Sequence, residues 1–232
     1  MMGDFKGFDP DGFMLLEINK FNDSRDFYES VKQDIKRMSI MPMRRLCSDL
    51  SEELYRIDPK MNLIPTKMVS RVRRDTRYSK NKQMYRSNIW CMFMRDKHQW
   101  ENFPCMWFEF FPDGYSYGVA MFRFDAKGLA AFRRKLIDNH QDFKRALTSV
   151  EITGAQPFIE SFKKDKPDID KVPQELKCYY NAKDFGFVFH SDDMKKLIDG
   201  SIYSELIYAV RAFEPMYTFL SEITDELVAK GE

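Results

Sequence analysis

Residues 106–124 read MWFEFFPDGYSYGVAMFRF and carry the strongest indication of fold in this chain of 232 residues. Two runs rich in aromatic side chains flank Pro112-Asp113-Gly114. That tripeptide is typical of a tight turn, because proline fixes φ and both aspartate and glycine accept turn conformations. Aromatic residues favour the pleated, half-buried surface of a sheet. The stretch therefore predicts two strands, 106–111 and 115–124, joined as an antiparallel hairpin.

Helical patterns flank this hairpin on both sides. Apolar residues recur every three or four positions in an N-terminal part, 10–57, and in a C-terminal part, 126–229, with one short strand near 185–189. The sheet region, 66–124, also contains expected strands centred on 69–73 and 89–94. Helices, then antiparallel strands, then helices predict an α+β fold: an antiparallel β-sheet flanked by helices, in a single domain over 1–232.

Prolines interrupt the expected helices and strands at two places. Pro42 should end or kink a helix that begins near Ser24, because proline lacks the N–H that an interior helical position requires. The segment 157–173 is charged and contains several prolines. It predicts an irregular connection or a mobile flap.

Composition excludes several classes of protein. The chain is 44% hydrophobic but contains no apolar run of about 18 residues and no signal peptide, so we expect a cytoplasmic protein without membrane contact. The four cysteines lie far apart and without metal-ligand spacing, which predicts buried free thiols and no metal. No glycine-rich phosphate loop, dinucleotide fingerprint or zinc-protease motif occurs, so no cofactor is expected.

The net charge of +1 conceals a strong asymmetry along the chain. Residues 66–86 carry eight basic side chains and one acid, a charge of +7, so the remainder of the chain carries −6. Clustered arginines bind phosphate or carboxylate through two parallel hydrogen bonds, and nearby hydroxyls add donors. The candidate ligand-binding residues are Arg71, Arg73, Arg74, Arg77, Ser79, Lys80, Lys82, Tyr85 and Arg86.

The stretch from Arg71 to Arg86, RVRRDTRYSKNKQMYR, resembles the signature of domain of unknown function 2461, which is close to R-x-x-R-D-T-R-F-S-x-x-K-x-P-Y-K. Glu109-Phe-Phe-Pro-Asp-Gly114 and Gly118 resemble the family's hairpin, and Pro173 to Phe185 resembles a later segment. The sequence departs from the signature at Tyr78, Met84 and Arg86. The family's opening helix pair is similar to the residues Leu16, Asn19, Asn22, Phe27, Tyr28, Lys32 and Pro42. The resemblance implies a fold and a shared basic motif, and brings no established activity.

Three functions are compatible with the basic motif. The preferred hypothesis is a module that binds an anionic, phosphate-bearing ligand: a phosphorylated small molecule or nucleotide, or, less favoured, a nucleic acid, with Tyr78 and Tyr85 able to stack on a base. A second is a protein-interaction domain that binds an acidic partner. The third is a structural motif whose cations pair internally with carboxylates such as Asp75, Glu109 and Asp125.

An enzyme that acts on a phosphorylated substrate is a further alternative, with Glu109 or Asp75 as the base. Glu109 shares one face of its expected strand with Trp107 and Phe111, and burial among aromatic rings would raise its pKa. An arginine of the basic motif would lower that pKa, and this ion pair is the favoured interpretation. The three histidines, His98, His140 and His190, are isolated in the sequence and receive no catalytic role.

Overall fold

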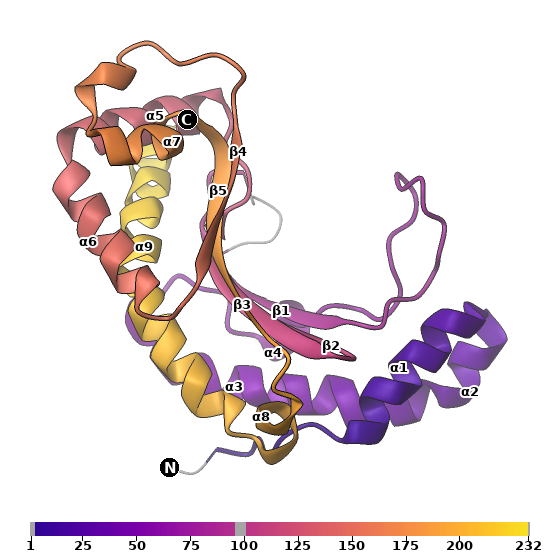
Figure 1. Cartoon of the computed structure of the whole chain (residues 1–232). Coiled ribbons are helices and arrows are strands. Elements are labelled where there is room, and N and C mark those ends of the chain that lie inside the picture. Colours follow the sequence, from indigo (N-terminus) through magenta and orange to yellow (C-terminus); the bar gives the residue numbers. More distant parts are fainter. Residues whose placement is uncertain (1–2, 96–100, 232) are drawn as a thin grey trace. The chain divides into compact units, whose positions relative to one another are not determined.

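The computed structural model describes residues 3–95 and 101–231. Its strands form a five-stranded antiparallel sheet in the order β1-β2-β3-β5-β4, with helices before and after them in the chain (Figure 1), so the predicted α+β class is confirmed. The chain divides into two compact units. Unit 1 comprises Met1–Phe93, Trp107–Ser116 and His190–Ile207, and unit 2 comprises Met94–Met106, Tyr117–Phe189 and Tyr208–Glu232.

Unit 1 begins with two helices that have clear side-chain caps. α1 (Pro10–Asn22) follows Asp9, whose carboxylate accepts the N–H of Asp11. α2 (Arg25–Ile35) follows Ser24, whose hydroxyl accepts the N–H of Phe27. Each cap satisfies an N–H that has no partner within the helix, which is why both helices begin where the sequence predicts.

Pro42 produces a π-helical turn rather than a break. α2 continues through the π-helical turn η1 (Lys36–Ile40) directly into α3 (Met41–Ile57), and the N–H of Met41 bonds to the carbonyl of Lys36, five residues back. The wider turn relieves the clash between the proline ring and the carbonyl four residues earlier, so the chain stays helical.

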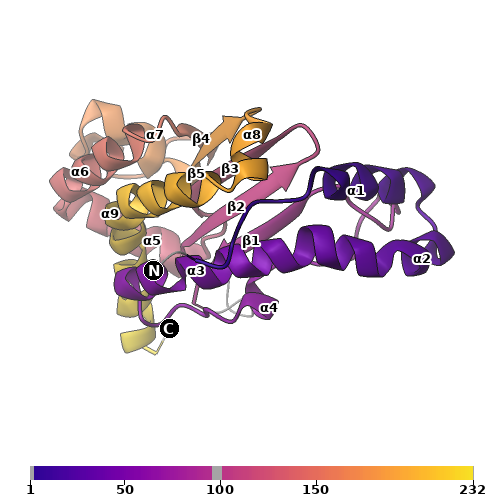
Figure 2. The same cartoon turned by 90° about the horizontal axis from the view of Figure 1, so that it is seen from below.

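The core of unit 1 forms where α3 and the N-terminal segment meet the strands. In both Figure 1 and Figure 2, α3 runs along β1 (Ile89–Phe93). Phe110 of β2 (Cys105–Phe111) packs against Phe8 and Phe13, with ring centroids 4.8 and 5.1 Å apart. The apolar spacing in α3 predicts four inward side chains; Leu46, Leu50 and Leu54 are fully buried, whereas Ile57 is only half-buried.

The predicted strand centred on 69–73 is wrong. Residues Pro65–Met68 form a short helix, α4, and Val69 and Arg73 form only isolated bridges, to Cys91 and Tyr85 respectively. The alternation of side chains is real, but the backbone changes its partner from β1 to the segment that follows the basic residues. A continuous ladder needs one neighbour throughout, so no strand forms.

The hairpin is confirmed, with a shorter second strand than expected. β2 ends at Phe111 and β3 (Gly114–Met121) begins after a two-residue turn, three residues short of the predicted end at 124. A Cβ atom at Gly114 would lie 2.4 Å from the carbonyl oxygen of Ser191, so only glycine fits there.

Unit 2 is built around one phenylalanine. Phe185, in β5 (Ala182–Ser191), is fully buried, and the helices of this unit lie on one side of β4 and β5 in Figure 1. α5 (Ala126–Asp138), α6 (His140–Glu151) and α7 (Lys177–Tyr180) each supply one of the surrounding rings. The rings whose centroids lie 5.2 to 6.4 Å from that of Phe185 belong to Phe124, Phe132, Phe143, Tyr179 and Phe187.

The segment 157–173, expected to be irregular, begins with a strand. β4 (Gln156–Ser161) pairs antiparallel with β5, so the C-terminal part contains two strands rather than one short strand near 185–189. β4 is largely exposed, which explains its weak apolar pattern and its tolerance of a proline. After it come irregular chain and two 3-10 turns, η2 (Ile169–Lys171) and η3 (Gln174–Leu176).

Two helices close the chain. α8 (Met194–Asp199) belongs to unit 1, and α9 (Ile202–Ala229) contributes its first residues to unit 1 and the rest to unit 2, with Pro215 inside it. Within residues 3–95 and 101–231, no helix is both long enough and apolar enough to cross a membrane.

Candidate functional site

The residues singled out in the sequence form a long two-armed loop of unit 1, which we call the basic loop (residues 71–86). It is the purple hairpin that extends away from the sheet in Figure 1. Near the base of the loop the two arms pair through two hydrogen bonds. The N–H of Arg74 bonds to the carbonyl of Met84 at 2.7 Å, and the N–H of Arg86 bonds to the carbonyl of Val72 at 3.2 Å. The pairing fixes the base of the loop and leaves residues 75–83 as its outer part.

The second arm of the basic loop is anchored to α1 and α2. One carboxylate oxygen of Asp23 accepts the N–H groups of Met84 at 2.7 Å and Tyr85 at 3.1 Å. The Tyr85 ring stacks on Tyr28 with centroids 4.8 Å apart and is 1% exposed. Tyr85 is therefore a structural anchor, and almost none of its surface is exposed to a ligand. Tyr78 is 95% exposed and remains accessible.

The outer part of the loop contains one ion pair. Arg77 donates from Nη2 and Nε to the Asp75 carboxylate at 2.7 and 3.0 Å, and these bonds lower the pKa of Asp75 to about 2. A carboxylate with so low a pKa is a weak base, which counts against a catalytic role for Asp75. Lys82 donates to the carbonyl of Thr76 at 3.0 Å, which closes the loop.

Most of the loop's cations lack a carboxylate partner among the described residues. Within residues 3–95 and 101–231, no hydrogen bond or ion pair is formed by the side chains of Arg71, Arg73, Arg74 and Lys80. Arg71, Arg73 and Lys80 are exposed, and Arg74 is half-buried. Of the acids expected to pair with the loop, Asp125 instead accepts the N–H of Gly128 at the start of α5. Internal pairing therefore accounts for only part of the loop's charge, which is +6 over residues 71–86.

At the base of the loop, Arg86 and Glu109 are half-buried together. Burial and the charge of Arg74 lower the pKa of Arg86, while Glu109 raises it. The Nε atom of Arg86 is buried and has no hydrogen-bond partner in the described part of the chain, and its guanidinium lies 6.0 Å from the centroid of the Trp90 ring. A buried donor without an acceptor costs about 1–3 kcal/mol, so an anion that reached this atom would be stabilised.

The pKa of Glu109 is shifted in the direction opposite to the one that an ion pair with an arginine predicts. Burial raises the pKa of Glu109 above its ordinary value, and this effect exceeds the lowering by a hydrogen bond from the Asn88 side chain and by the charges of Arg86 and His190. The expectation that an arginine would hold this pKa down is wrong, because no arginine reaches the carboxylate closely enough to offset its burial.

Sequence reasoning missed Asp23, Asn88 and His190. Asp23 lies about 60 residues before the loop that it holds, and nothing in the spacing of Asn88 or His190 relates them to Glu109. His190 is brought near Glu109 by β5, which runs ten residues and ends at Ser191. His98 lies outside the described residues.

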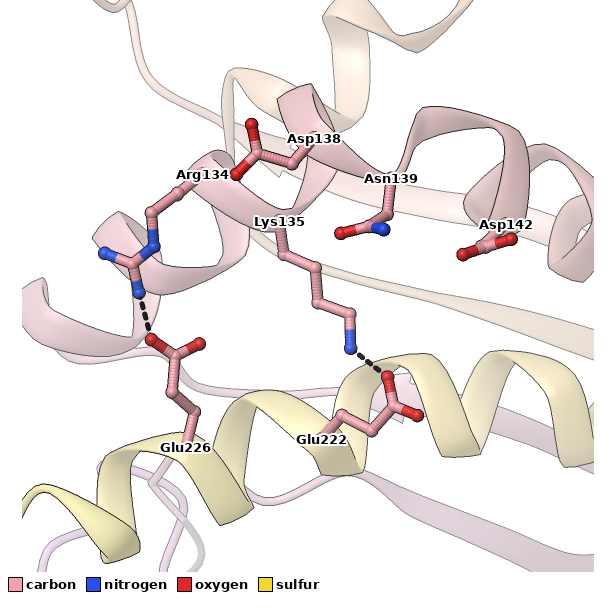
Figure 3. A pocket seen from close by; sticks show the side chains of 7 residues that line it. All are labelled: Arg134, Lys135, Asp138, Asn139, Asp142, Glu222 and Glu226. Atoms are coloured by element: carbon pink, nitrogen blue, oxygen red, sulfur yellow. Dashed lines mark hydrogen bonds and ion pairs between the residues drawn. The ribbon is translucent and has the colours of Figure 1, made fainter.

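A separate cavity of about 320 Å³ lies in unit 2, between α5 and α9. Figure 3 shows Arg134 and Lys135 extending from α5 toward Glu226 and Glu222 of α9, and each forms an ion pair there. Asp138, Asn139 and Asp142 complete the lining. Since both cations already have carboxylate partners and the lining is acidic overall, this cavity is unsuited to an anion.

The cysteines and acids offer no metal centre in the described part of the chain. Cys47, Cys91 and Cys105 are buried free thiols as predicted, whereas Cys178 is exposed. Burial raises the pKa of the Cys105 thiol, so that side chain is unreactive.

Fold and site together define an α+β protein with a cationic surface loop. Residues 12–219 match the model of the family described as "Conserved hypothetical protein (DUF2461)". The chain belongs to this family, as its basic motif, helix pair and hairpin predict. No curated protein and no solved structure matched the chain.

Proposed function

We propose that this protein binds an anionic, phosphate-bearing ligand through the basic loop. The observation that carries the proposal is the set of unpaired cations in the described structure: Arg71, Arg73 and Lys80 are exposed and have no carboxylate partner. Arg74 and the buried Nε of Arg86 add unsatisfied positive charge at the base of the loop. The charge of Arg74 lowers the pKa of Arg86, so these two cations repel each other, and a phosphate relieves that repulsion while accepting hydrogen bonds from the guanidinium groups.

The anchoring of the loop supports the same function. Asp23 and Tyr28 hold the second arm in place, so a ligand need not order it on binding. Preorganisation of this kind reduces the entropic cost of association. At the tip, the Arg77 guanidinium lies 5.9 Å from the centroid of the Tyr78 ring. That ring is exposed and offers a stacking surface to a base.

The test is a titration of the full chain with pyrophosphate and with a labelled single-stranded oligonucleotide. The double variant Arg71→Ala/Arg73→Ala should weaken binding by about tenfold or more, because hydrogen bonds from charged groups contribute about 1.5–3 kcal/mol. Arg45→Ala, which removes an exposed arginine of α3 outside the loop, is the matched control and should bind as the unmodified protein does.

Salt dependence separates the ligand classes. If the oligonucleotide binds, log affinity should fall with log salt by about 0.7 per contacted phosphate, and the double variant should flatten that slope. Tight binding of pyrophosphate alone indicates a small phosphorylated ligand. Equal affinity of the double variant and Arg45→Ala would refute a role for the loop, and polyglutamate binding in place of both phosphate probes would indicate an acidic protein partner.

An enzyme acting on a phosphorylated substrate is the second candidate, and the raised pKa of Glu109 is what favours it. A carboxyl group whose pKa lies nearer neutrality is a better general base, and Arg86 is close enough to act on it electrostatically. Turnover of p-nitrophenyl phosphate by the unmodified protein, lost in Glu109→Gln, would support this candidate. Equal rates in the two proteins would remove Glu109 from it.

A further inference from the structure

α5 of unit 2 carries three consecutive cations in three different surroundings. Lys135 and Arg134 extend toward α9 and pair with Glu222 and Glu226 (Figure 3). Arg133 instead donates from Nε to the carbonyl of Tyr180 at 3.0 Å. It is the one of the three whose charge has no carboxylate partner in the described structure.

The Arg133 guanidinium is enclosed by aromatic rings. It lies 5.4 Å from the ring centroid of Phe162 and 5.7 Å from that of Tyr180. Its Nη2 atom is buried and has no hydrogen-bond partner among the described residues, and burial lowers the pKa of this arginine. An acceptor is therefore missing at a defined atom.

Two lysines also lie near the Phe162 ring. Lys166 Nζ lies 3.6 Å from the Phe162 ring centroid, and Lys183 Nζ lies 5.7 Å from it. Lys183 pairs with Glu160 at 2.8 Å, whereas Lys166 forms no ion pair in the described structure. Arg133 and Lys166 are thus two neighbouring, uncompensated positive charges.

Both side chains line a cavity of about 470 Å³, a size typical of small-molecule sites. Four basic and two acidic residues line it, and one of the basic residues, Arg134, pairs with Glu226 outside the lining, so the net charge including that partner is +1. One of the two acids, Asp168, is already paired with Lys171 at 3.0 Å. Ala130 and Ile137 of α5 supply an apolar wall beside the charges.

We propose that this cavity binds a small organic anion. A carboxylate or phosphate oxygen accepts hydrogen bonds from Arg133 Nη2 and Lys166 Nζ, and the apolar part of the molecule rests on Ala130 and Ile137. The site lies wholly in unit 2 and shares no residue with the basic loop, so it stands or falls independently of the proposed function.

The test uses phenyl phosphate and benzoate as probes, with methyl NMR of the full chain. Each probe that binds should shift the Ile137 and Ala130 methyl signals saturably. Lys166→Met should weaken that binding by about tenfold, the cost of one charge-assisted hydrogen bond, and Arg133→Met by at least as much. The relative affinity of the two probes shows whether the anion is a phosphate or a carboxylate.

Two comparisons keep the proposal falsifiable. Lys164→Met removes an exposed lysine of the same connection that does not line the cavity, and should leave binding unchanged. Lys166→Met retains the bond from Arg133 to Tyr180, so it serves if Arg133→Met fails to fold. Absence of any shift at Ile137, or equal affinity of Lys166→Met and Lys164→Met, would overturn the proposal. Arg71→Ala/Arg73→Ala should leave the Ile137 titration unchanged.

Discussion

The Asp23 carboxylate accepts the backbone N–H of Met84 at 2.7 Å, so the residue that ends α1 also holds the second arm of the basic loop. The family signature has a proline at this position, and a proline has no N–H to donate. In this chain the hydrogen bond from Met84 restrains the turn in place of a proline ring. The same oxygen accepts the N–H of Tyr85, so one side chain fixes two consecutive residues.

Replacing Asp23 should destabilise unit 1. Asp23→Ala leaves the N–H groups of Met84 and Tyr85 without their acceptor and places alanine at φ +43°, a left-handed conformation that it adopts poorly. We expect the free energy of unfolding to fall by about 2–4 kcal/mol, measured by urea denaturation.

Asp23→Asn is the matched control for that change. Asparagine tolerates the left-handed conformation and keeps an oxygen that can accept both N–H groups, so it should lose less than half as much stability. Equal losses in the two variants would show that the negative charge, rather than the hydrogen bonds, holds the loop.

Arg77→Ala should change the titration of Asp75 clearly and the stability of the fold only slightly. The pKa of Asp75, lowered to about 2 mainly by the Arg77 side chain, should rise toward 3.8 in a carbon-detected NMR titration. Both side chains are exposed, so solvent screens their ion pair, and the melting temperature at neutral pH should fall only slightly. A clear drop in melting temperature would instead indicate that Arg77 pairs with a buried carboxylate.

The hairpin and the helix starts could be predicted because their determinants are local. Pro112-Asp113-Gly114 specifies its turn wherever it occurs, and Ser24 caps α2 from three residues away. The basic stretch gave a false strand because its side-chain alternation is also local, whereas pairing is not. Arg73 pairs with Tyr85, twelve residues later, and no periodicity within 69–73 reports that partner.

The candidate site could be predicted in composition but not in electrostatics. The excess of basic residues in 66–86 indicates the basic loop, and the family motif indicates which residues belong to it. Whether an arginine pairs with Glu109 depends on distances across the sheet. In the structure the Asn88 side-chain amide donates a hydrogen bond to that carboxylate. Similarly, Tyr85 cannot be distinguished from Tyr78 by sequence, although one is buried against Tyr28 and the other is almost fully exposed.

Unit 2 should depend strongly on Phe185. Phe185→Ala removes a fully buried ring that contacts rings on both flanking helices, and the cavity it leaves should cost about 3–5 kcal/mol of unfolding free energy. Phe122→Ala is the matched control, because that ring is 38% exposed and stacks at 6.0 Å on Phe158. A similar loss in both variants would contradict the central place of Phe185 in this core.

Glu109 should make the stability of the protein depend on pH in a defined direction. Because burial raises the pKa of Glu109 above 4.5 in the folded state, the unfolded chain loses this proton first as the pH rises. The folded state then binds more protons than the unfolded state, so the free energy of unfolding falls with rising pH and levels off above the folded pKa. Glu109→Gln removes this decline and should gain stability relative to the unmodified protein between pH 4.5 and neutrality.

A substitution of Asn88 tests the pKa of Glu109 independently. Its side-chain amide donates to the Glu109 carboxylate and lowers the pKa, so Asn88→Ala should raise the pKa of Glu109 further and extend the decline in stability to higher pH. Urea denaturation at a series of pH values, with the Glu109 carboxyl carbon followed by NMR, measures both effects. Parallel stability curves for the unmodified protein and Glu109→Gln would mean that the carboxylate is as well solvated in the folded state as in the unfolded chain. Such a result would contradict both the raised pKa of Glu109 and a role for it as a general base.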